Sequence, residues 1–150
     1  MIKPGRSVKD VDISNDSDAE HIFNELEQSG GFEARNVAEG VDILYNMISD
    51  EKCTKFLSFI GAIVSTGFRG IIRDMIKKKW CDVIITTCGA LDHDIAKHIS
   101  EYKEGSFTMD DRELADQKIH RLGNVLVPME SYGPLIEEKV QAILEKAYSE

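Results

Sequence analysis

Residues 56–94 of the chain read FLSFIGAIVSTGFRGIIRDMIKKKWCDVIITTCGALDHD. Two apolar runs of strand length, 54–60 and 81–87, are each followed by a loop of small residues and then by a helical pattern. Continuous apolar character is typical of strands that are covered on both faces of a parallel sheet. In such sheets, ligands bind where the carboxyl ends of strands meet the amino ends of helices. This stretch therefore predicts an α/β fold with a nucleotide-binding edge.

The composition is that of an ordinary soluble protein. The chain has 150 residues, 42% of them hydrophobic and 30% charged, which is enough for one domain with a core. Its net charge of −9 argues against nucleic acid or an anionic membrane surface as the main partner. The start of the chain lacks the apolar core of a signal peptide, and no apolar run approaches the length of a membrane span. These features indicate a soluble cytoplasmic protein.

Neither the three cysteines nor the acidic amino-terminal stretch has the sequence pattern of a metal site. Cys53, Cys81 and Cys88 form no CxxC pair, so neither a disulfide framework nor a zinc site is expected, which favours a reducing compartment. The aspartates between residues 10 and 18 lack the glycine and the closing glutamate of a calcium loop. We therefore expect no bound metal.

The remaining pattern predicts alternating helices and strands after an extended arm at residues 1–17. Ser17 or Asp18 can cap the first helix, and residues 18–150 are expected to form one α/β domain. Helices are expected near 18–29, 37–49, 68–79, 92–100 and 134–148, and a third strand at 124–127. Strands that alternate with helices predict right-handed crossovers and a single parallel sheet. A sheet of three strands leaves at least one edge for another chain or for further strands.

The first loop, residues 61–67, combines small side chains with the start of a helix. Its backbone N–H groups could meet a phosphate, and Ser65 and Thr66 could add hydroxyl donors. Alternatively, Ser65 or Thr66 simply caps the following helix. The sequence leaves both interpretations open.

The second loop ends in three ionisable residues, Asp92, His93 and Asp94. Asp92 could cap the next helix, because a carboxylate is stabilised at a helix amino end. Beside a nucleotide loop, the three side chains would also suit a polyamine, whose amines need acceptors and negative charge. His93 alone is more often structural, and Cys88 is better explained as a small loop residue than as a nucleophile, since nothing marks its base.

Five segments of the chain resemble deoxyhypusine synthase of the archaeal type, and they occur in the order of that family. They are GGFEARNVAEGVDIL (30–44), CTKFLSFIGAIVSTGFRGIIRDMI (53–76), CDVIITTCGALDHDIAK (81–97), GSFTMDD (105–111) and HRLGNVLVPMESYGPLIE (120–137). The resemblance covers almost the whole chain after residue 25. It implies a Rossmann-like parallel sheet with flanking helices, forming the amino-terminal half of an NAD-binding fold.

The resemblance also implies roles for the two loops. In the family, the corresponding residues bind NAD; here they are Gly61, Ala62, Ile63, Val64, Ser65, Thr87, Cys88 and Gly89. The pair that matches Asp92 and His93 contacts spermidine. Eukaryotic members carry two glutamates at these positions, but a neutral imidazole can also accept a hydrogen bond from an amine.

Family members use NAD to oxidise spermidine and pass its aminobutyl group, through an enzyme lysine, to a lysine of the translation factor 5A precursor. That catalytic lysine lies in the carboxyl-terminal half, and none of the twelve lysines here stands in a matching context. The resemblance therefore implies that no catalytic residue lies in this chain. It predicts the amino-terminal subunit of a split enzyme, completed by a separate carboxyl-terminal chain in a tetramer-like hetero-oligomer.

Two alternatives to the split enzyme remain open. The chain could be a non-catalytic regulator of a full-length synthase, in which case its loops would not be needed for catalysis. It could also belong to a homospermidine synthase-like enzyme, in which a free polyamine accepts the aminobutyl group. The consumption of a precursor protein or of a diamine would distinguish the two chemistries.

Overall fold

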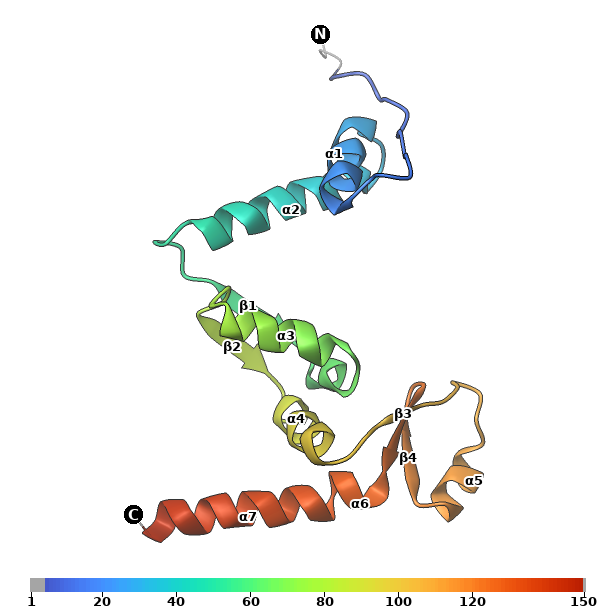
Figure 1. The fold of residues 1–150 in the computed structure, drawn as a ribbon, viewed down its shortest axis with the longest axis vertical. Coiled ribbons are helices and arrows are strands. Elements are labelled where there is room, and N and C mark those ends of the chain that lie inside the picture. The colour runs from blue at the N-terminus through green and yellow to red at the C-terminus, as the bar shows by residue number, and fades with distance from the viewer. Residues whose placement is uncertain (1–4, 150) are drawn as a thin grey trace. The chain divides into compact units, whose positions relative to one another are not determined.

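The computed structural model describes residues 5–149, and the chain divides into two compact units, Met1–Lys55 and Phe56–Glu150 (Figure 1). The elements in chain order are α1 (Ala19–Ser29), α2 (Ala34–Ser49), β1 (Phe56–Phe59), the 3₁₀ helix η1 (Gly61–Ser65), α3 (Phe68–Lys77), β2 (Val83–Thr86), α4 (Gly89–Ile99), β3 (Lys103–Glu104), α5 (Asp111–Asp116), β4 (Ile119–Leu122), β5 (Val125–Pro128), α6 (Met129–Tyr132) and α7 (Pro134–Ser149). Within the described residues, no helix is both long and apolar enough to cross a membrane.

The first unit is a pair of packed helices, α1 and α2, and the preceding segment is hydrogen-bonded to α1 through Arg6, Lys9 and Asp12. Asp18 accepts a 2.8 Å hydrogen bond from the backbone N–H of His21, so the predicted cap is confirmed. Gly30, at a φ of 66°, ends the helix in the left-handed conformation. The Arg6 guanidinium donates to the backbone oxygen and the carboxylate of Glu27, at 3.0 and 2.9 Å. Residues 5–14 contain no helix or strand.

The second unit contains the predicted β–α–β arrangement. Strands β1 and β2 pair in parallel from Phe56–Val83 to Phe59–Thr86, and α3 connects them. The predicted α/β fold, with a parallel sheet and flanking helices, is confirmed. Both strands are shorter than their apolar runs, because ladder pairing covers only the four residues that face each other.

The third predicted strand does not join the parallel sheet, which corrects the sequence-based topology. It forms β5, which lies between β3 and β4 in a separate antiparallel sheet. The cause is the tight turn at Gly123 and Asn124, where Gly123 has a φ of 64°. A two-residue connection can only return the chain antiparallel, whereas a parallel partner needs a long crossover. Strand β4, which the sequence analysis missed, is the other arm of this hairpin.

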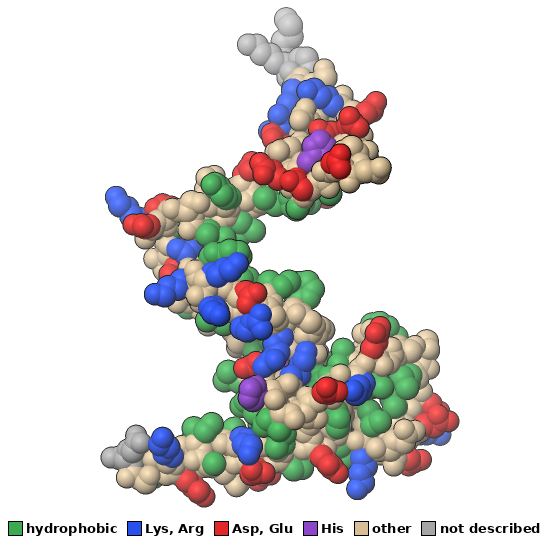
Figure 2. Space-filling view, viewed as in Figure 1, with side chains coloured by type: hydrophobic (Ala, Val, Ile, Leu, Met, Phe, Trp, Pro, Cys, Tyr) green, Lys and Arg blue, Asp and Glu red, His purple; other side chains and the backbone are tan. Residues whose placement is uncertain are grey.

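One face of the parallel sheet is open, although the sequence predicts strands covered on both sides. The exposed fractions of Phe56, Val83 and Ile85 are 62%, 36% and 56%. Apolar side chains reach the surface in the space-filling view as well (Figure 2), and no large side chain among the described residues is fully buried. Within the second unit, residues 56–149 do not cover this face of the sheet.

Candidate functional site

The two predicted loops meet at the carboxyl ends of β1 and β2. The backbone N–H of Gly61 donates a 3.0 Å hydrogen bond to Oγ1 of Thr87, and Oγ1 of Thr86 donates to the backbone oxygen of Phe59 at 2.8 Å. Because the parallel strands end in register, η1 lies directly against the start of α4. We call residues 61–65 and 87–89 together the loop junction.

The two loops approach each other most closely at Gly61. A Cβ atom at Gly61 would lie 2.4 Å from the backbone nitrogen of Ala90, 2.6 Å from Oγ1 of Thr87 and 2.8 Å from the carbonyl carbon of Gly89. These distances are far below van der Waals contact, and two of the three atoms belong to the backbone. The junction in this form is therefore possible only with glycine at position 61.

The predicted cofactor residues differ in how they face solvent. Val64 and Ser65 are only 4% and 3% exposed, whereas Thr87 and Cys88 are exposed. The Thr66 hydroxyl donates to the backbone oxygen of Ile63 at 2.7 Å and accepts from the backbone N–H of Phe68 at 3.2 Å. The hydroxyl of Thr66 is thus engaged within the chain, and that of Ser65 belongs to a buried residue. A ligand at this loop would meet mainly backbone and small side chains.

The start of α4 has no side-chain cap, and backbone hydrogen bonds close its first turn. Cys88 occupies the N-cap position and makes no capping hydrogen bond with its side chain. The alternative that Asp92 caps this helix is wrong, because α4 begins at Gly89, three residues earlier than predicted. The N–H groups of Ala90, Leu91 and Asp92 donate to the backbone oxygens of Thr87 and Cys88 at 2.9–3.1 Å, so the fit to a dinucleotide rests on the small residues of the loop junction and their close approach at Gly61. The residues present are therefore compatible with NAD.

Asp92 and His93 lie in the first turns of α4 and have different surroundings. Asp92 is partly exposed, whereas His93 is 7% exposed. Nδ1 of His93 lies 3.0 Å from the hydroxyl of Tyr102, and its ring centroid lies 4.9 Å from that of Tyr132. Burial lowers the pKa of His93, and this outweighs the opposing effect of Asp92. The lowered pKa favours the neutral imidazole, which is the form that can accept a hydrogen bond.

The two tyrosines around His93 were missed by the sequence analysis. Burial raises the pKa of Tyr102 to about 12, so its hydroxyl stays protonated. Burial, followed by the neighbouring Asp92 carboxylate, also raises the pKa of Tyr132. Both contacts join residues from different elements, so no local spacing could have revealed them.

Lys97 is the third missed residue, and it connects α4 to the first loop. Its ammonium group donates to the backbone oxygens of Ser65 and Thr66 at 2.9 and 2.7 Å. Lys97 follows His93 by four residues, a spacing that places both on the same face of a helix. That spacing was the one signal available in the sequence.

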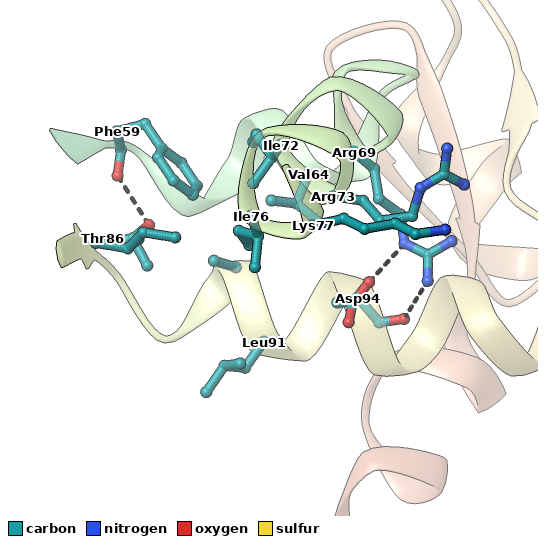
Figure 3. Close-up of a pocket in the computed structure, with 12 residues that line it drawn as sticks. Phe59, Val64, Arg69, Ile72, Arg73, Ile76, Lys77, Thr86, Leu91 and Asp94 are labelled. Atoms are coloured by element: carbon teal, nitrogen blue, oxygen red, sulfur yellow. Dashed lines mark hydrogen bonds and ion pairs between the residues drawn. The ribbon is translucent and has the colours of Figure 1, made fainter. Parts of the chain in front are cut away.

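A groove of about 530 Å³ runs between α3, α4 and the covered face of the parallel sheet (Figure 3). Its walls are mainly apolar, and Arg69, Arg73 and Lys77 bring positive charge to it. Arg69 is held by Asp94 through a 2.6 Å ion pair. Of the predicted cofactor residues, only Val64 lines this groove. It is therefore distinct from the exposed side of the loop junction.

No metal site accompanies the junction. Across residues 5–149, no group of three or more His, Cys, Asp or Glu side chains is placed to hold a metal ion.

Burial of His93 should make the folded chain less stable in acid. Because its pKa lies below the ordinary value of 6.5, the unfolded chain binds more protons as the pH falls through 6.5. The free energy of unfolding should therefore fall with pH in that window. Urea unfolding at several pH values measures this effect, and the His93→Gln variant should show a smaller slope. An equal slope in both proteins would contradict the assignment.

Residues 21–150 match a family model described as deoxyhypusine synthase. A "Probable deoxyhypusine synthase" of Picrophilus torridus is 48% identical over 143 residues, which are 95% of this chain and 46% of the relative. One of Thermoplasma acidophilum is 49% identical over 144 residues, or 96% of this chain and 46% of the relative. The chain thus spans about half the length of these curated relatives.

Among solved structures, the chain is similar to one from Entamoeba histolytica, described as a "putative deoxyhypusine synthase". The sequence identity is 24% and the TM-score is 0.48. The match covers 73% of this chain and 44% of the other chain.

Proposed function

Because this chain belongs to the deoxyhypusine synthase family, we propose that it forms the amino-terminal part of an NAD-dependent transferase of that type. The reaction moves the aminobutyl group of spermidine to a lysine of the translation factor 5A precursor. Bound NAD would supply the hydride acceptor for the oxidation of spermidine. The family membership supports a place for the chain in a transferase, and the activity, cofactor and substrates are our proposal.

The observation that carries the proposal is the loop junction. The loops that follow the two parallel strands are joined by the hydrogen bond between Gly61 and Thr87, and α4 begins at the same place without a side-chain cap. This is the edge of an α/β sheet at which ligands bind. Gly61–Ser65 and Thr87–Gly89 would bind NAD there, largely through their backbone.

Asp92 and His93 would hold the polyamine. The partly exposed Asp92 carboxylate can form a charge-assisted hydrogen bond with an ammonium group. In the tautomer in which Nδ1–H of His93 donates to the Tyr102 hydroxyl, Nε2 of the neutral imidazole can accept from an amine. Tyr102 and Tyr132 would fix the orientation of the imidazole.

We further propose that the catalytic lysine comes from a separate carboxyl-terminal chain. The open sheet face around Phe56, Val83 and Ile85 supports such a partner, because apolar strands of this kind are normally covered. The curated relatives are about twice as long as this chain, which leaves a second half of similar size to provide the cover. The complete enzyme would be a hetero-oligomer of both halves.

The expected compartment is the cytoplasm. Cys53, Cys81 and Cys88 are all free in the structure, which suits a reducing environment. The precursor of a translation factor would also be met there.

Native mass spectrometry of the protein purified from its own cells tests the split enzyme. We expect a second chain of similar size that carries the catalytic lysine, and the complex should transfer the aminobutyl group when given NAD, spermidine and precursor. A full-length synthase as the partner would indicate a regulator. Transfer to a free diamine in place of the precursor would indicate a homospermidine synthase. Recovery of this chain alone would contradict the proposal.

A further inference from the structure

The ammonium group of Lys97 binds the end of the first loop. It donates to the backbone oxygens of Ser65 and Thr66, which lie at the carboxyl end of η1. The last carbonyls of a helical turn have no partners within that turn, and a cation there satisfies them and complements the local dipole. The two bonds join residues 31 and 32 positions apart, so they fix the loop to α4.

The Lys97 side chain also lies near the residues that are predicted to bind the polyamine. Its ammonium lies 5.8 Å from the ring centroid of Tyr102, within the range of a cation–π contact. The Tyr102 hydroxyl in turn contacts His93. Lys97 thus lies between the loop that would bind NAD and the pair that would bind spermidine.

The Lys97 side chain is partly buried, and this has an electrostatic cost. Burial, and then the nearby Arg69, lower the pKa of Lys97. A charge in this position needs compensation, and the two carbonyl oxygens provide it. A neutral side chain of the same length would leave these carbonyls without the ammonium donor.

We propose that Lys97 is a positioning residue for the cofactor loop, holding residues 61–66 in the conformation that meets the dinucleotide. The identity of the ligand in this inference rests on the proposed function. The two hydrogen bonds from Lys97 to the first loop, which we call the clamp, are a property of the fold. A loop displaced by about 1 Å can reduce ligand binding or turnover by one to two orders of magnitude. Loss of the ammonium should therefore affect NAD more than spermidine.

Hydrogen exchange tests the clamp independently of catalysis. In Lys97→Met, measured on the full chain in the assembly in which it purifies, amides of residues 61–67 should exchange about tenfold faster. Amides of β4 and β5 should be unchanged. Lys97→Arg, whose guanidinium can also donate to two carbonyls, should restore most of the protection. Unchanged exchange at 61–67, or an equal rise in all elements of both variants, would overturn the proposal.

Steady-state kinetics of the complete enzyme supply the second readout. Lys97→Met should raise the KM for NAD about tenfold, and that for spermidine less than about threefold. Lys139→Met is the matched control, because Lys139 on α7 pairs only with its neighbour Glu138 among the contacts described. An unchanged KM for NAD alongside faster exchange would overturn the role in cofactor binding. Absence of NAD dependence in the wild type would instead refute the proposed function and leave the exchange result standing.

Discussion

Replacing Gly61 by alanine is expected to break the loop junction and to lower NAD affinity by more than about a hundredfold. The added Cβ would lie 2.4 Å from the backbone nitrogen of Ala90, so either η1 or the start of α4 must move. Overpacking of this kind costs about 3 kcal/mol, and here the clash involves backbone that cannot rotate away. The hydrogen bond from Gly61 to Thr87 would be lost at the same time.

Urea unfolding and isothermal calorimetry with NAD, both on the complete enzyme, measure the two effects. Gly70→Ala is the matched control, because Gly70 lies in α3 and nothing occupies the space within 4 Å of its added Cβ. That variant should be about 0.5–1 kcal/mol more stable than the wild type, since alanine is the better helix former. Equal behaviour of the two variants would show that the junction is not needed.

Replacing Asp92 by asparagine is expected to raise the KM for spermidine about thirtyfold while leaving that for NAD within about threefold. A hydrogen bond to a charged group contributes about 2 kcal/mol, and asparagine keeps the shape of the side chain but removes its charge. The KM for spermidine and the KM for NAD should change by different amounts because of where Asp92 lies. Asp92 lies in the first turn of α4, beyond the residues of the loop junction.

Asp94→Asn provides the matched control for this prediction. Asp94 lies two residues later on the same helix and forms an exposed ion pair with Arg69. Its substitution should leave both KM values within about twofold, because exposed ion pairs contribute little. Equal losses for NAD and spermidine in Asp92→Asn, or a larger loss in Asp94→Asn, would refute the assignment of Asp92 to the polyamine.

Local chemistry explains why much of the fold was predictable. The apolar runs before Gly61 and Cys88 specify strands, and Asp18 and Gly30 specify the two ends of α1. These are properties of neighbouring residues and need no knowledge of the rest of the chain. The topology of β5 was not predicted in the same way, because β4 has only four residues and its sequence, IHRL, does not alternate apolar and polar side chains.

The candidate site was predictable in its location but not in its contacts. The two loops were expected to meet because parallel strands in register bring their carboxyl ends to one edge. Whether a side chain faces solvent there depends on what packs over it, and this buries Ser65 while leaving Cys88 exposed. The partners of His93, namely Tyr102 and Tyr132, come from later parts of the chain.

By itself, the sequence determined the α/β class, strands β1 and β2 with helices α1, α2, α3, α4 and α7, and the two loops that meet at the candidate site. Only the tertiary structure decided that β5 joins an antiparallel sheet, that Lys97 holds the first loop and that one sheet face stays open. The physical reason is the distance along the sequence over which each kind of interaction acts. Propensity, periodicity and capping act over a few residues, whereas the bond from Lys97 to the first loop and the pairing of β1 with β2 join segments more than 20 residues apart. The antiparallel pairing of β5 with β4 is set more locally, by the turn at Gly123 and Asn124.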